Sequence, residues 1–154
     1  MKRKTPHPAA AKALERKQKF QGWKTTDEEE IERRRLRASQ EPFLIRPAEP
    51  GHPFYGRFAC HSEGSGRTYL VEIRSMTQPE NACQCPDFLS NGLGTCKHIE
   101  AVLSHLALEQ KRRFAQAARE GSRRVEIYLS RQGTPEIKVS WPTPYSTTSL
   151  PLSP

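Results

Sequence analysis

The segment that organises this chain reads CQCPDFLSNGLGTCKHIEAVL, residues 83–103. It contains a C-x-C pair, Cys83 and Cys85, and a C-x-H pair, Cys96 and His98. Zinc prefers four thiolate or imidazole donors at the corners of a tetrahedron, and this segment supplies donors of that kind in that number. The sequence therefore predicts a zinc ion held by these four residues.

The two pairs need different backbone conformations if their side chains are to converge on one metal ion. Residues two apart in an extended strand point to one face, so Cys83 and Cys85 can both face a metal. Residues two apart on a regular helix diverge, so Cys96 should precede a helix and His98 should lie in its first turn. Apolar spacing predicts that helix from Lys97 to about Ala118, on the residues Ile99, Val102, Leu103 and Leu106.

The spacer between the pairs, residues 86–95, contains turn-forming residues. Asn91-Gly92 is a turn dipeptide, and Gly94 allows a second reversal before the C-x-H pair. Three thiolates, one neutral imidazole and Zn²⁺ together carry about −1, which a helix N-terminus and Lys97 would partly offset. Because protein donors fill all four positions, the pattern favours a structural zinc over a catalytic one.

Other interpretations of the cysteines and histidines stay open. Cys60 could replace His98 as a ligand, although packing within a strand is its simpler role. His105 lies two turns beyond, about 10 Å along the helix axis, which is too far to share the ion. His7 and His52 lie in proline-rich stretches. The cysteines could also be small buried apolar residues. A dithiol redox pair is disfavoured, because such pairs use C-x-x-C beside a βαβ pattern.

Composition limits what else the chain can be. Only 34% of the 154 residues are hydrophobic and the mean hydropathy is −0.79, so a core cannot extend over the whole chain. Small domains with little core often depend on a bound metal. The net charge of +8 suits a polyanionic partner without indicating one by itself. We find neither a signal peptide nor a transmembrane stretch, so we treat the cysteines as those of a cytosolic protein.

The first 41 residues are expected to form a basic arm that is helical and partly disordered. Thr26 and Glu29 form a capping-box pattern at the start of a charged helix in which only Ile31 and Leu36 are apolar. A helix of this kind has no apolar face to pack against a core, so we expect it to be exposed to solvent on all sides. The alternative is that it docks on nucleic acid or on a partner protein.

Residues 42–119 are expected to form an α+β domain. The turn Glu63-Gly64-Ser65-Gly66 separates two strand-like runs and predicts a hairpin. The expected fold is a small antiparallel sheet in which zinc pins a hairpin to a helix. The strand-like runs are residues 43–45, 54–59 and 67–74.

A strand pair is expected over residues 120–141. Gly121 should end the long helix, and Val125, Ile127 and Leu129 alternate as a strand that can pair with residues 137–141 across Gln132-Gly133. The final segment, 142–154, is rich in proline, serine and threonine and is expected to be disordered.

The pattern C-x-C, variable loop, C-x-H resembles the SWIM zinc finger. The resemblance extends to Pro86-Asp87-Phe88 after the first pair and to Lys97 inside the second. It implies that zinc joins a β-hairpin to the start of a helix, and that the same four residues are the ligands.

A wider resemblance covers residues 46–141. The segments GRTYLVEIRSM, NACQCPDFLSNGLGTCKHIEAVL and RVEIYLSRQG, in that order, are similar to the N-terminal region of bacterial Swi/Snf-type helicase-like ATPases, where a SWIM finger precedes the motor. This implies a module that helps to position an ATPase on nucleic acid or on a partner. This sequence has no G-x-x-x-x-G-K-[ST] loop, so ATPase activity does not carry over and we expect no enzyme activity.

Together these patterns predict a zinc-binding module that contacts DNA or protein, is associated with a helicase-like ATPase, and lies in the cytoplasm or on the nucleoid. We expect neither a membrane nor a small-molecule substrate as a partner. Two alternatives stay open: a protein–protein adaptor without nucleic-acid binding, and a redox sensor whose thiolates release zinc on oxidation. The candidate phosphate contacts are Lys97, Lys111, Arg112, Arg113, Arg123 and Arg124.

Overall fold

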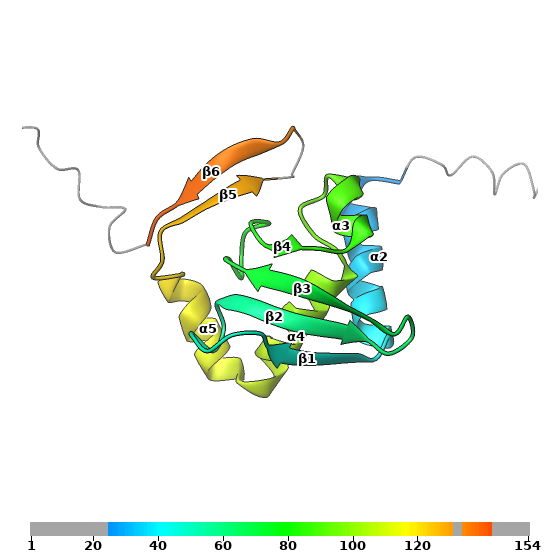
Figure 1. Ribbon diagram of the computed structural model, residues 1–154, viewed down its shortest axis with the longest axis horizontal. Helices are drawn as coiled ribbons and strands as arrows, with labels where there is room; N and C mark the ends of the chain where they lie inside the picture. The colour runs from blue at the N-terminus through cyan, green and yellow to red at the C-terminus, as the bar shows by residue number, and fades with distance from the viewer. Residues whose placement is uncertain (1–24, 131–133, 143–154) are drawn as a thin grey trace, which may run out of the picture.

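The computed structural model describes residues 25–130 and 134–142. Our predictions for the first 24 residues, for the tail from residue 143 and for the turn at Gln132-Gly133 concern residues outside these ranges. The described part has the expected α+β fold, with a four-stranded antiparallel sheet, a two-stranded ribbon and four helices (Figure 1). Among these helices, none has the length and apolar character needed to cross a lipid bilayer.

The larger sheet has the strand order β1-β2-β3-β4, with every neighbouring pair antiparallel. The predicted hairpin is the β2–β3 pair, but β2 begins later than expected and continues through Cys60 to Ser62. Phe54 and Tyr55 leave the sheet and are buried elsewhere in the core, which explains the later start. The strands are β1 (Phe43–Pro47), β2 (Gly56–Ser62), β3 (Arg67–Ile73) and β4 (Ala82–Cys83).

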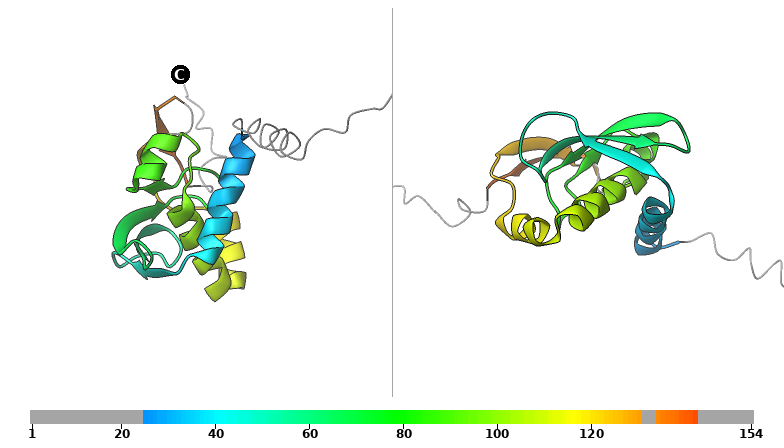
Figure 2. Two further views of the ribbon diagram at one scale, coloured as in Figure 1. Left: turned by 90° about the vertical axis from the view of Figure 1, so that its right-hand side faces the viewer. Right: turned by 90° about the horizontal axis from the view of Figure 1, so that it is seen from below.

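One face of this sheet packs against α4 (Lys97–Glu109). The register pairs Phe58 with Val71, and Val71 with Cys83, so these side chains share that face. Figure 2 shows α2 (Asp27–Gln40), α4 and α5 (Lys111–Glu120) on one side of the sheet, which makes this part of the domain two layers thick. The helix contributes Ile99 and Val102, which are fully buried, and each such side chain stabilises the fold by about 1.5–3 kcal/mol.

The single helix predicted from Lys97 to Ala118 is wrong, because the structure contains two helices. Gln110 has φ −139° and ψ 56°, which interrupts the helix between α4 and α5 (Lys111–Glu120). The break turns α5 back toward the domain, where the Tyr55 hydroxyl donates a 2.7 Å hydrogen bond to the carbonyl of Ala117. Phe54 and Phe114 make an edge-to-face contact there, with ring centroids 6.0 Å apart. A straight helix would lose these contacts.

The charged helix α2 (Asp27–Gln40) begins with the predicted capping box between Thr26 and Glu29. None of its residues is buried, as the lack of an apolar face indicated. The helix is nevertheless not freely solvated, because it docks on the domain through ion pairs. Arg34 contacts Asp87 at 2.6 Å with its side chain only 13% exposed, and Arg35 contacts Glu100 at 3.3 Å.

The predicted C-terminal strand pair is present as β5 (Glu126–Ser130) and β6 (Glu136–Ser140), which form a separate ribbon. Gly121 ends α5 with φ 72°, as expected. The ribbon meets the larger sheet through Arg74, which pairs with Glu126 at 3.1 Å and lies 4.7 Å from the ring centre of Tyr128.

The docking of α2 leads to a first prediction. Replacing Arg34 with Met should lower the free energy of unfolding by about 1–3 kcal/mol, because Asp87 loses a bidentate partner in a partly buried site. Urea unfolding of the zinc-loaded protein, followed by circular dichroism, measures this change.

Arg33→Met is the matched control, because Arg33 is 62% exposed and contacts only Glu30 of its own helix. It should change stability by at most about 0.5 kcal/mol. Equal effects of the two variants would show that α2 is not held by the Arg34 contact.

Candidate metal centre

The four predicted ligands come together in the structure. All four are buried, with exposed fractions of 4% for Cys83, 1% for Cys85, 0% for Cys96 and 4% for His98. Their candidate donor atoms all lie within 4.8 Å of one another. Three sulfur donors and one imidazole at this spacing form a group that could hold a metal ion, and the donor types suit zinc.

The first pair of ligands lies where the sheet ends. Cys83 is the last residue of β4 and faces the core because of its pairing with Val71. Cys85 follows the strand and caps the N-terminus of α3 (Pro86–Asn91). The backbone N–H of Phe88 lies 3.4 Å from the Cys85 sulfur, and the N–H of Cys85 lies 3.4 Å from the Cys83 sulfur. Hydrogen bonds of this kind favour the thiolate form, which is the form that binds metal.

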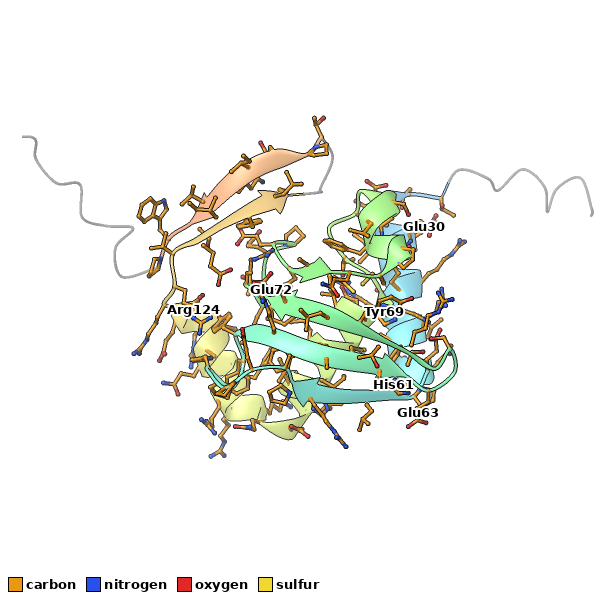
Figure 3. All side chains as sticks on the ribbon, in the orientation of Figure 1. Glu30, His61, Glu63, Tyr69, Glu72 and Arg124 are labelled. Carbon is orange, nitrogen blue, oxygen red and sulfur yellow. The ribbon has the colours of Figure 1, made fainter. Side chains whose placement is uncertain are left out.

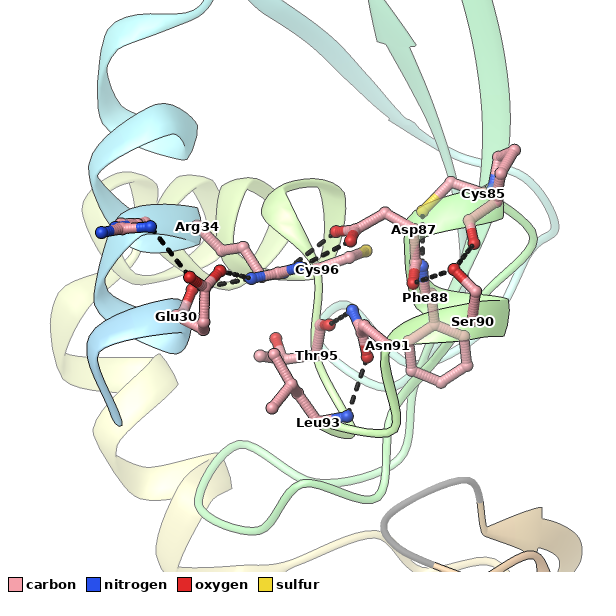
Figure 4. A network of polar contacts seen from close by, with 12 residues as sticks. Glu30, Arg34, Cys85, Asp87, Phe88, Ser90, Asn91, Leu93, Thr95 and Cys96 are labelled. Carbon is pink, nitrogen blue, oxygen red and sulfur yellow. Dashed lines mark hydrogen bonds and ion pairs between the residues drawn. The ribbon is translucent and has the colours of Figure 1, made fainter. Parts of the chain in front are cut away.

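The spacer between the pairs is more ordered than the expected loop, because it contains α3. Pro86 opens this helix at a position where a missing N–H costs nothing, and buried Phe88 anchors it. The expected reversals do occur at Gly92 and Gly94, which have φ of 66° and 72°. The Asn91 side chain closes the turn (Figure 4), with its amide donating to the carbonyl of Thr95 at 2.9 Å.

The second pair lies at the start of α4, as predicted. Cys96 is the N-cap residue in an extended conformation, with φ −154° and ψ 169°, and His98 lies in the first turn. His98 Nδ1 lies 3.9 Å from the Cys96 sulfur. The imidazole ring packs between two aromatic side chains of the sheet, 4.8 Å from Tyr69 and 5.7 Å from Phe43 between ring centroids. These contacts fix the direction of the ring.

The three thiols affect one another's pKa values through burial and mutual hydrogen bonds. The hydrogen bond with Cys85 raises the pKa of Cys83 to about 12. Hydrogen bonds to Cys83 and Cys85, together with burial, raise the pKa of Cys96, whereas hydrogen bonds from Cys83 and Cys96 lower that of Cys85. Burial and the closeness of the three sulfur atoms therefore disfavour the ionisation of all three thiols together. A bound divalent cation would supply the compensation that three thiolates require.

Cys60, His105 and His52 lie outside the group of four candidate ligands. Cys60 lies on the inner face of β2 with no exposed surface, outside the group of four, and burial raises the pKa of its thiol to about 11. This geometry fits a packing role. His105 lies 3.5 Å from Glu109 on α4. His52 accepts hydrogen bonds at Nδ1 from the backbone N–H groups of Phe54 and Tyr55, so it stabilises a turn.

A shell of charged residues around the site was not predicted. Arg34 of α2 binds both carboxylate oxygens of Asp87, two residues after Cys85 (Figure 4). Glu41, just after α2, accepts a hydrogen bond from Lys97, which lies between the last two ligands. Arg34 belongs to a charged run, whereas Glu41, Asp87 and Lys97 are single charges between uncharged residues. The partners lie 53 and 56 positions apart, and nothing in the local sequence indicates which partner each residue meets.

The candidate phosphate contacts do not all lie in similar surroundings. Lys97 is 17% exposed and its ammonium group is paired with Glu41. The five other candidates are exposed and lie on α5 or in the segment that follows it: Lys111, Arg112, Arg113, Arg123 and Arg124.

Comparison of the chain with models of known protein families, with curated proteins and with solved structures found no match.

The geometry predicts how ligand variants will behave with Co²⁺, which takes the place of zinc and absorbs visible light according to its ligands. The intact protein should bind one Co²⁺ with bands typical of tetrahedral coordination by sulfur and nitrogen. His98→Ala should weaken binding by about 10-fold or more and change the spectrum, because one of four donors is lost.

Cys60→Ala is the control and should leave both the stoichiometry and the spectrum unchanged. A spectrum that changes in Cys60→Ala and stays constant in His98→Ala would assign the fourth ligand to Cys60 instead.

Proposed function

We propose that this protein is a non-catalytic zinc-binding module of the SWIM type that binds DNA through a basic surface formed by α5 and the segment after it. The observation that carries the proposal is the buried group of three cysteines and one histidine, which joins the edge of the sheet to the start of α4. Support for the SWIM type comes from the spacing of these residues and from the strand–helix arrangement around them.

The surroundings of the site support a structural role for the zinc. Four protein donors would complete its shell, and all four are buried, so water and substrate have neither a coordination position nor access. A closed site of this kind contributes its binding free energy to folding. Burial also weighs against the alternative of a redox sensor, because sensor cysteines are exposed to the oxidant.

The distribution of charge supports α5 as the phosphate-binding surface. On α2 the arginines are matched with nearby carboxylates, including those of Glu30, Glu32, Glu41 and Asp87. Around α5 the only ion pair among the described residues joins Arg123 to Glu120 at 3.8 Å. The remaining exposed cations there are Lys111, Arg112, Arg113, Arg119 and Arg124, the last of which is labelled in Figure 3.

This surface fits DNA through its phosphates and not through its bases. Unpaired arginine and lysine side chains neutralise phosphates and release counterions regardless of sequence. Lys97 is not part of the proposed surface, because its ion pair with Glu41 would have to break first. The resemblance to the accessory region of helicase-like ATPases supports a partner of that type, which the module would help to position on DNA.

Salt dependence tests the proposed DNA surface. The double variant Lys111→Gln/Arg112→Gln should bind a short DNA duplex more weakly. The slope of log K against log salt concentration should fall by about 1–2, because up to two phosphate contacts are lost. Fluorescence anisotropy at several salt concentrations measures the slope.

Arg33→Gln/Arg37→Gln removes the same charge from α2, where both residues are paired with carboxylates and more than half exposed. This control should keep the slope of the unaltered protein. A protein without salt-dependent DNA binding, or a control with the same loss as the α5 variant, would contradict the proposal and favour the adaptor.

A further inference from the structure

The ribbon β5–β6 has an apolar face that points into solvent. The register pairs Ile127 with Val139 and Leu129 with Ile137, so these four side chains lie on one face, and alternation adds Val125. Their exposed fractions are 74% for Ile127, 76% for Ile137, 54% for Val125, 49% for Leu129 and 46% for Val139. We call these five residues the ribbon face.

The opposite side of the ribbon makes its contacts with the domain. Tyr128 and Ser130 are buried, and Glu126 pairs with Arg74. The ribbon therefore turns its polar and aromatic side inward and its aliphatic side outward, the reverse of the usual arrangement for a strand pair at a surface. A two-stranded ribbon is marginally stable alone and gains stability when its apolar face is covered.

The size of the ribbon face also sets it apart from scattered surface residues. Its exposed side chains present roughly 500 Å² of apolar area, near the upper end of the largest patches found on monomeric proteins. The face carries no charged residue, since Lys138 and Glu136 lie on the other side of β6 and pair with each other at 3.0 Å. DNA would leave such a surface uncovered, because phosphates require cations.

We propose that the ribbon face is covered by the ribbon face of a second copy of this chain, so that the protein forms a twofold symmetric dimer. Two such faces in contact would bury about 1,000 Å² from these side chains alone, which reaches the lower limit of area expected for a biological interface.

The composition of the face fits a copy of itself. The cross-strand pairs Ile127–Val139 and Leu129–Ile137 have similar bulk, so rotation by a half-turn places equivalent pairs over one another.

Sedimentation of the zinc-loaded full chain over the micromolar concentration range tests this inference, which does not depend on DNA binding. The unaltered protein should shift reversibly from monomer to dimer as concentration rises. Ile127→Glu/Ile137→Glu should weaken dimerisation by roughly tenfold or more, because the carboxylates would be buried without partners. Both positions are about three-quarters exposed in one chain, so the variant should keep its zinc content and circular dichroism spectrum.

Leu108→Glu is the matched control, because Leu108 is 83% exposed on α4, away from the ribbon. It should leave dimerisation unchanged. The inference is overturned by a protein that stays monomeric throughout, by a dimer that withstands the ribbon variant, or by equal effects of the two variants. A monomer that instead forms a stoichiometric complex with a different protein through this face would also overturn it.

Discussion

The fold depends on the meeting of a strand end and a helix start at four buried side chains. Cys83 and Cys85 lie at the edge of the sheet, and Cys96 and His98 open α4, so a metal bound by all four would fix how the two layers pack. The core beside this site is small. Structural zinc contributes about 10 kcal/mol or more of binding free energy, which is comparable with the whole stability of a small domain, about 5–15 kcal/mol.

Around this centre the chain uses charge where it lacks apolar surface. Helix α2 buries no residue, yet its ion pairs reach Asp87 and Glu100, and Glu41 just after the helix pairs with Lys97. Of the exposed cations that have no carboxylate partner among the described residues, four lie on α5 and Arg124 follows it, whereas Arg46 and Arg67 lie singly on the larger sheet. The same basic protein thus has one region in which charges stabilise the site and another in which they are available to a polyanion.

What could be predicted from the sequence was local. The ligand spacing, the position of Cys96 before a helix, the reversals at Gly92 and Gly94, and the capping box at Thr26 each depend on a few neighbouring residues. The break at Gln110 was missed because nothing near it interrupts the helical pattern. The contacts made by α5 after the break are with Phe54 and Tyr55, which are distant in the sequence. The docking of α2 and the outward face of the ribbon likewise depend on partners that periodicity cannot identify.

We infer that a metal at Cys83, Cys85, Cys96 and His98 holds the two layers together. The most direct measurement is thermal unfolding of the purified protein before and after removal of metal by a chelator, with metal content determined in parallel. We expect one zinc per chain, loss of cooperative unfolding when it is removed, and recovery when zinc is restored. Cooperative unfolding at an unchanged temperature in metal-free protein would contradict it.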